Sequence, residues 1–279
     1  MIGIFDSGVG GLSVLRAINQ QMPHEPFIYL ADQANVPYGS RSLDEVRGFA
    51  EGISRYLLGQ GCKLIVVACN AASAAALHHL RHAFPETPFV GMEPAVKPAA
   101  EHTHSGVVGV LATPATFQGA LYASVVERFA QGVKLMQHTC PGLVQQIEAG
   151  QLDTQATRRI LEDALKPMLA EGIDTVVLGC THYPFVIPLI REIAGEQVRV
   201  VDPAPAVARQ VGRILDSQGL HDLDAYWQSD LMGQAPARRF LTTGDPQQLA
   251  AMLPHLLGKE AGTVEGLKWQ SGHLLEISS

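Results

Sequence analysis

The sequence predicts an α/β fold with two pseudo-symmetric domains, each a mostly parallel sheet flanked by helices, and a candidate active site between them. Short apolar runs alternate with helical patterns along the chain, as in parallel sheets built from βαβ crossovers. Two of these runs, residues 64–68 and 175–179, are each followed at once by a cysteine, Cys69 or Cys180. Ligands bind at the carboxyl ends of such strands, so both thiols reach one site if the halves face each other.

The first part of the chain is expected to contain four strands joined by helices. The strands are expected at residues 2–5, 27–31, 64–68 and 89–91, and the helices from residue 12, over 42–60 and over 71–84. The glycine-rich segment 6–11 lies between a strand and a helix, where backbone amides can bind an anion. Asp6 adds a carboxylate at the strand's end. The loop 32–40 offers the hydroxyl of Tyr38, and a packed tyrosine in a surface turn is the alternative.

The rest of the chain repeats this alternation. Strands are expected at 106–111, 134–137, 175–179, 199–201, 239–242 and 264–268, and helices from about 114 to 130 and over 141–148, 154–171, 185–194, 203–217 and 246–257. Pro94 and Pro98 mark a crossing into a second half. Residues 226–236 are expected to be irregular.

Composition excludes several classes of protein. The formal net charge of −7 and the lack of a basic patch argue against a nucleic-acid partner and favour a soluble cytoplasmic protein. No apolar segment approaches the ~18 residues that span a membrane, and no signal peptide precedes the first strand. The four cysteines form no CxxC pair, so we expect free thiols and no metal. His78 and His82 lie one helical turn apart, but a solvated helix face explains them.

The paired cysteines narrow the chemistry. A single cysteine at a strand end more often belongs to the core, and one activated thiol would suit acyl transfer or oxidoreduction. Two thiols, one from each half, suit a reaction at two opposed faces of one carbon, and racemisation is the clearest case. A free thiol has a pKa of about 8.5, near enough to neutrality to act as acid or base.

Each thiol needs a neighbour that exchanges its proton. Asp6 could serve Cys69, and His182 could serve Cys180, since histidine titrates near neutral pH. The carbanion formed between the thiols needs preorganised donors, which loop amides and nearby polar side chains could supply. The candidates are Ser7, Asn70 and Thr181.

Eight stretches, which span nearly the whole chain, make the sequence resemble the glutamate racemases of the aspartate/glutamate racemase family. These are FDSGVGG (5–11), VPYGSRS (36–42), ACNAAS (68–73), GMEPA (91–95), ATPAT (112–116), CPGLVQQIE (140–148), VVLGCTHYP (176–184) and TTGDP (242–246). The resemblance implies cofactor-independent interconversion of L- and D-glutamate, which supplies D-glutamate for peptidoglycan, and a homodimer. It also implies one domain of residues 1–95 plus 208–279 and a second of residues 96–207.

The resemblance also implies a role for each site residue. Cys69 would handle the proton of the D-substrate and Cys180 that of the L-substrate, assisted by Asp6, Glu148 and His182. The residues around glutamate would be Asp6, Ser7, Tyr38, Gly39, Asn70, Ala71, Thr113, Thr116, Thr181 and His182. Family members usually have threonine where this chain has Ala71. The missing hydrogen bond to a charged group is worth about 1.5–3 kcal/mol, which predicts weaker binding or turnover.

Three alternatives remain. The first is a racemase of aspartate or a related acid, which the VPYG loop and Ser7-Gly8 disfavour. The second is a pyridoxal-phosphate racemase, but the lysines lie outside the strand ends that resemble a site. The third is a non-catalytic, gyrase-binding protein on the same scaffold, which the intact cysteine pair disfavours. Because the first strand begins at the N-terminus, we also expect no activation by a cell-wall precursor.

Overall fold

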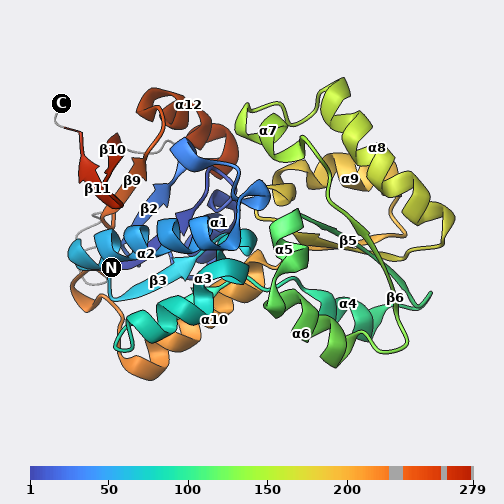
Figure 1. Ribbon diagram of the computed structural model, residues 1–279, viewed down its shortest axis with the longest axis horizontal. Coiled ribbons are helices and arrows are strands. Elements are labelled where there is room, and N and C mark those ends of the chain that lie inside the picture. Colours follow the sequence, from blue (N-terminus) through green and yellow to red (C-terminus); the bar gives the residue numbers. More distant parts are fainter. Residues whose placement is uncertain (226–234, 259–262, 278–279) are drawn as a thin grey trace.

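The computed structural model describes residues 1–225, 235–258 and 263–277, arranged around two sheets that lie side by side (Figure 1). Among these residues, no helix is long and apolar enough to cross a membrane. The predicted irregular segment 226–236 falls mostly outside the described residues.

The first sheet combines strands from both ends of the chain, in the order β11-β10-β9-β2-β1-β3-β4. Its strands are β1 (Ile2–Asp6), β2 (Phe27–Ala31), β3 (Leu64–Val67), β4 (Phe89–Gly91), β9 (Arg238–Thr242), β10 (Val264–Gln270) and β11 (His273–Glu276). All neighbouring pairs are parallel except β10 and β11. The β10–β11 hairpin therefore places the antiparallel strand at the sheet's edge.

The second sheet is wholly parallel, in the order β6-β5-β7-β8. Its strands are β5 (Val107–Ala112), β6 (Lys134–His138), β7 (Thr175–Gly179) and β8 (Arg199–Val201). This order matches the β2-β1-β3-β4 part of the first sheet. In both sets of four strands, the first strand in sequence lies between the second and the third. Cys69 and Cys180 thus follow equivalent strands, β3 and β7, which is the pseudo-symmetry expected from the sequence.

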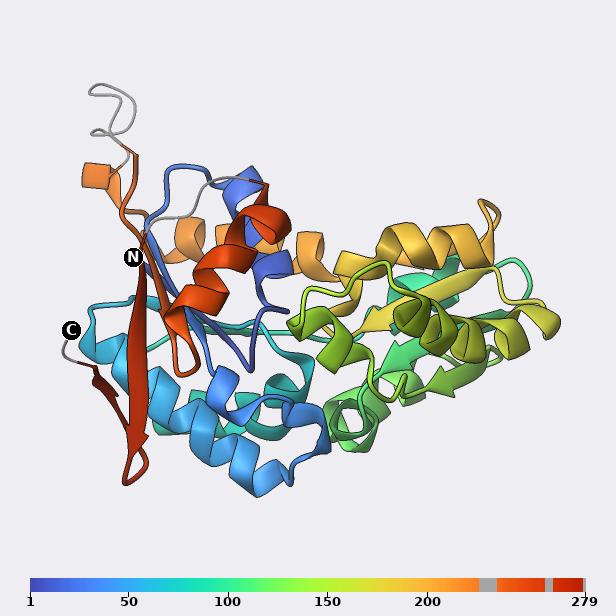
Figure 2. The same cartoon turned by 90° about the horizontal axis from the view of Figure 1, so that it is seen from above.

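Helices cover both faces of each sheet (Figure 2). The first sheet has α1 (Leu12–Gln21), α10 (Ala204–Gln218) and α12 (Pro246–Leu257) on one face, and α2 (Leu43–Gly59) and α3 (Asn70–Ala83) on the other. The second sheet has α7 (Leu143–Glu148), α8 (Gln155–Ala170) and α9 (Ile187–Ala194) on one face, and α4 (Val96–His102) and α6 (Ala120–Phe129) on the other. α5 (Pro114–Gln118) precedes α6.

The central strands are buried on both faces because their side chains alternate between two cores. In β3, Leu64 and Val66 belong to the core under α1 and α10, while Ile65 and Val67 belong to the core under α2 and α3. The first of these cores continues into the second sheet, where it includes Leu178 of β7. One apolar core therefore joins the two halves.

The fold class predicted from the sequence is confirmed, with three local corrections. Helix α4 lies where only a crossing marked by Pro94 and Pro98 was expected. The helix expected from about 114 to 130 is interrupted at Gly119, whose backbone is extended. Gly119 packs so closely on α3 that a Cβ there would lie only 2.6 Å from that of Ala74. Strand β11 was not expected, since its short polar pattern resembles a loop. The domain division stays a prediction, and its second boundary, 207/208, lies inside α10.

Candidate active site

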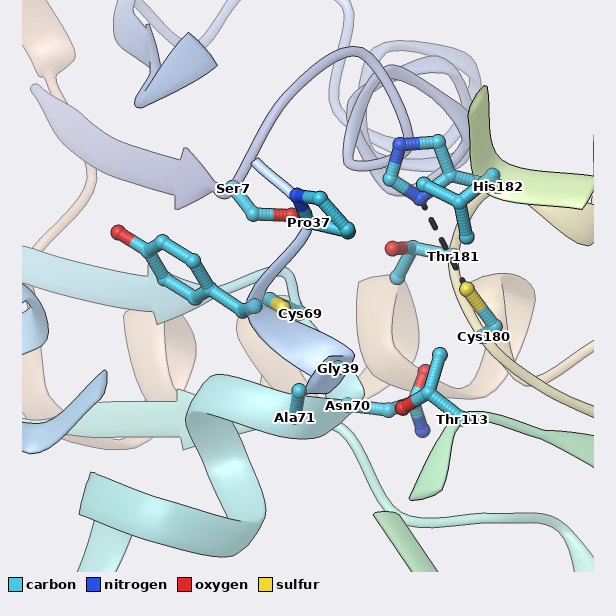
Figure 3. A pocket seen from close by; sticks show the side chains of 12 residues that line it. Ser7, Pro37, Gly39, Cys69, Asn70, Ala71, Thr113, Cys180, Thr181 and His182 are labelled. Atoms are coloured by element: carbon cyan, nitrogen blue, oxygen red, sulfur yellow. Dashed lines mark hydrogen bonds between the residues drawn. The ribbon is translucent and has the colours of Figure 1, made fainter. Parts of the chain in front are cut away.

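A small pocket lies between the two halves, at the carboxyl edges of both sheets (Figure 3). Both thiols line it, Cys69 from the first half and Cys180 from the second. The complete lining is Ser7, Pro37, Tyr38, Gly39, Cys69, Asn70, Ala71, Thr113, Val144, Cys180, Thr181 and His182. Asp6, Glu148 and Thr116, which the sequence also suggested, lie behind this lining.

Cys69 begins helix α3 and is almost fully buried, with its sulfur 3.5 Å from the amide of Ala72. Burial, followed by the negative charge of Asp6, holds the pKa of this thiol well above its usual value. Asp6 is itself fully buried, and burial raises its pKa, although the charge of His182 and hydrogen bonds from Cys69 and Gly11 oppose the rise. The Asp6 carboxyl is therefore placed to exchange a proton with the first thiol.

Cys180 faces a different partner. Its sulfur lies 3.7 Å from Nδ1 of His182, whose Nε2 donates to Glu148 Oε1 over 2.6 Å. Burial alone would lower the pKa of His182, but its hydrogen bonds with Cys180 and Glu148 raise it well above the usual value. Burial alone would raise the pKa of Glu148, but donors led by His182 lower it. A histidine–carboxylate pair joined by a short hydrogen bond therefore stands behind the second thiol.

The glycine-rich segment after β1 makes room for this pair. A Cβ at Gly8 would lie 1.9 Å from Glu148 Oε1, and one at Gly10 would lie 2.4 Å from His182 Nδ1. Between them, the amide of Val9 donates to Glu148 Oε1 over 2.7 Å. These glycines allow the backbone of the first half to approach Glu148 and His182 of the second half closely. The anion that the segment binds is thus the protein's own carboxylate.

The loop that carries Tyr38 and Gly39 closes the pocket from the first half. Tyr38 lines the pocket, and its hydroxyl donates to Asp32 over 2.6 Å. This hydroxyl proton is therefore already used in a hydrogen bond within the protein. A Cβ at Gly39 would lie 2.5 Å from that of Thr113, and glycine here permits close contact with the second half. Thr113 lines the pocket, and its hydroxyl lies 3.1 Å from the hydroxyl of Thr116, which lies behind the lining.

Asn70 offers unused hydrogen-bonding capacity. It is 3% exposed, and both polar atoms of its side chain find no partner among the residues that the structure describes. Unpaired buried polar groups are costly, so they indicate a missing ligand at this point. Asn70 also begins α3, whose positive end favours an anionic group such as a carboxylate. Ala71, next along the helix, contributes only a methyl group.

Sequence reasoning missed residues of two kinds. Pro37 and Val144 line the pocket, and Gln33 and Thr242 stand behind Glu148. The stretches VPYGSRS and TTGDP were noticed as patterns, but they gave no reason to single out Pro37 or Thr242. Within the described parts of the chain, no group of three or more histidine, cysteine or acidic side chains could hold a metal ion.

The geometry supports proton transfer at two faces of one bound carbon. Each thiol comes from the equivalent strand end of a different half, and each has its own proton-exchanging neighbour. Small polar groups and a helix start surround the space between them. The arrangement fits a small anionic substrate.

Comparison with known proteins agrees with this chemistry. The model of the Asp/Glu/hydantoin racemase family matches residues 2–211. Curated glutamate racemases of Roseiflexus sp. (strain RS-1) and Ectopseudomonas mendocina (strain ymp) are each 50% identical to this chain. The first alignment covers 91% of both proteins, and the second covers 93% of this chain and 95% of the relative.

Solved structures show the same likeness. A glutamate racemase isoform from Bacillus anthracis superposes with a TM-score of 0.82 at 32% identity, over 98% of both chains. Escherichia coli glutamate racemase, solved with L-glutamate and the activator UDP-MurNAc-Ala, gives 0.78 at 31% identity. That match covers 91% of this chain and 94% of the other.

Proposed function

The chain belongs to the Asp/Glu/hydantoin racemase family, and on that premise we propose that its two-thiol pocket interconverts L-glutamate and D-glutamate. One observation carries the proposal. Cys69 and Cys180 follow equivalent strands of two facing sheets and line one pocket between them. A carbon bound there has one thiol available on each face.

In the direction from L to D, the Cys180 sulfur takes the α-proton as the C–H bond breaks. The electron pair stays on the substrate as a carbanion, and the Cys69 thiol gives its proton to the opposite face. In the reverse direction the two thiols exchange roles. Each turnover leaves one thiol with an extra proton and the other without one. The His182–Glu148 pair and Asp6 restore the starting state by exchanging protons with Cys180 and Cys69 respectively.

The carbanion is the high-energy species, and fixed donors must stabilise it. The side chain of Asn70 and the first turn of α3 lie beside Cys69, and Thr181 lies beside Cys180. The buried side chain of Asn70 has no hydrogen-bond partner among the described residues, so its amide can donate to the carbanion without first breaking another hydrogen bond.

The test is cofactor-free exchange. Pure protein is incubated with L-glutamate in D₂O, and optical rotation and α-deuterium are followed together. Loss of rotation with deuterium uptake is expected, and both signals should vanish in Cys69→Ala and Cys180→Ala, since one face then lacks its acid or base. Turnover of aspartate but not glutamate would contradict the substrate assignment. Full activity in either variant would contradict the two-thiol mechanism.

We also propose a homodimer that works in the cytoplasm, where it supplies D-glutamate for peptidoglycan. The domain division into 1–95 plus 208–279 and 96–207 belongs to the same proposal. The two-sheet topology supports it, because strands from both chain ends share the first sheet. Light scattering should give twice the chain mass of 29.9 kDa, and a mass equal to one chain would contradict the dimer.

A further inference from the structure

We propose that Gln33 and Thr242 are positioning residues for Cys180, acting from the other half of the molecule through Glu148 and His182. The inference rests on the proposed function, in which Cys180 is one of the two proton-transferring thiols. It gives a role to the TTGDP stretch, which the pocket itself leaves without one.

The Glu148 carboxylate is held from three sides. Oε1 accepts from His182 of its own half and from the amide of Val9. Oε2 accepts from Nε2 of Gln33 over 3.2 Å. Two of the three donors therefore come from the first half, although Glu148 lies at the end of α7 in the second. Together they fix the plane of the carboxylate that orients His182.

Thr242 and Glu148 together hold the orientation of the Gln33 amide. The hydroxyl of Thr242 donates to Oε1 of Gln33 over 2.8 Å, while it accepts from the amide of Gly244 over 2.9 Å. A hydroxyl has one proton and two acceptor sites, so the Thr242 hydroxyl can accept from Gly244 and still donate to Gln33. The Glu148 carboxylate only accepts, so it takes the amide nitrogen of Gln33. The amide oxygen must then point to Thr242 and the amide nitrogen to Glu148. Without this hydroxyl, the Gln33 amide oxygen loses its donor, and the amide is held by Glu148 alone.

Gly244 brings the turn close enough for this contact. A Cβ at Gly244 would lie 2.8 Å from that of Gln33 and 3.4 Å from the Thr242 hydroxyl oxygen. Thr242 itself is fully buried at the carboxyl end of β9. The TTGDP turn is therefore packed directly on Gln33, in an arrangement that a larger residue at position 244 would displace.

The chain of hydrogen-bonding contacts leads to Cys180 and not to Cys69. It runs from Thr242 through Gln33, Glu148 and His182 to Cys180, whereas Cys69 is paired with Asp6 of its own half. Neither Gln33 nor Thr242 lines the pocket. Losing either should therefore change the reactivity of Cys180 relative to Cys69, with little effect on substrate binding.

Iodoacetamide labelling measures this selectivity without any assumption about substrate. The full-length protein is labelled at neutral pH, and the initial rates at Cys69 and Cys180 are read from the same sample by peptide mass spectrometry. In Gln33→Leu and Thr242→Val, the Cys180-to-Cys69 rate ratio should fall at least about threefold. With L-glutamate, kcat should fall roughly tenfold, while KM stays within about twofold.

Two variants serve as controls. Thr242→Ser keeps the hydroxyl and should retain the wild-type labelling ratio and kcat, which a general packing defect would not predict. Gln197→Leu removes another partly buried amide, one that only donates to Ala194, and should leave both values unchanged.

An unchanged or increased labelling ratio in Gln33→Leu and Thr242→Val would overturn the inference, as would a rise in KM with constant kcat. If the ratio falls but the wild type does not racemise glutamate, Gln33 and Thr242 do position Cys180, and the proposed function is wrong.

Discussion

At the residue scale, the pocket has an alanine, Ala71, where the family resemblance leads us to expect threonine. The residue is 4% exposed and lines the cavity beside Asn70. A threonine there would add a donor next to the start of α3, where an anionic group of the substrate is favoured. The chain therefore offers one hydrogen bond fewer than the residues usual at this position would supply.

We expect Ala71→Thr to raise kcat/KM for glutamate by about tenfold, because one hydrogen bond to a charged group is worth about 1.5–3 kcal/mol. Initial rates of racemisation, followed by circular dichroism, give this value. Ala71→Val has the same shape without the hydroxyl and is the matched control. An equal gain in both variants would assign the effect to packing, and no gain in Ala71→Thr would show that another group already makes the contact.

The glycines of the segment after β1 are a second feature of the site at the residue scale. Gly10→Ala would push a methyl group to within 2.4 Å of His182 Nδ1 and 2.8 Å of Asp6 Oδ2. Both thiols would lose their aligned partners, so kcat should fall by at least about a hundredfold, since small displacements are costly in proton transfer. Gly48→Ala is the control, because nothing lies within 4 Å of a Cβ there. Near-normal turnover in Gly10→Ala would show that the loop can shift to accommodate the added methyl group.

At the scale of elements, sequence reasoning located the strand ends but not what connects them. Apolar runs followed by Cys69 and Cys180 predicted the two facing edges, because periodicity and burial are local properties of a strand. The Gln33–Thr242 contact joins residues far apart in the chain, and neither residue type indicates catalysis. The close approach that requires Gly8 and Gly10 likewise depends on the second half, so the glycines suggested only a turn.

The end of α10 is tied to the segment before β2 by a histidine between two carboxylates. His221 Nε2 lies 2.8 Å from Asp216 Oδ1, and Nδ1 lies 2.5 Å from Oε1 of the buried Glu25. Hydrogen bonds to Asp216 and then Glu25 raise the pKa of His221 above its usual value of 6.5. The charged form is thus favoured by folding. Its stabilisation is fully present below pH 6.5 and is lost as the pH rises through the higher pKa of the folded state.

The melting temperature of the wild type should therefore exceed that of His221→Gln by more at pH 6 than at pH 8.5. Differential scanning fluorimetry at both values measures the two gaps. The difference should shrink in 1 M salt, because His221 is partly exposed. Equal gaps at both pH values would mean that the ring contributes by packing alone.

At the scale of the whole molecule, one apolar core runs from α1 and α10 to β7, so we expect the two halves to unfold as one cooperative unit. Leu178 of β7 is fully buried in that core, just before Cys180. Leu178→Ala should destabilise the protein by about 2–5 kcal/mol, as for other large-to-small core changes. Because the core is shared, this loss should reach the first sheet as well.

Trp269 of β10 reports on the first sheet once Trp227→Phe has removed the other tryptophan. In that background, Leu178→Ala should lower the urea midpoint of Trp269 fluorescence and of far-ultraviolet circular dichroism together. Leu223→Ala, at an exposed leucine, is the control and should change the free energy of unfolding by no more than about 0.5 kcal/mol. If the fluorescence midpoint stayed fixed while circular dichroism moved, the halves would unfold separately. A site that needs both halves docked, as the Gln33–Glu148 contact does, would then lose its second thiol before the first sheet melts.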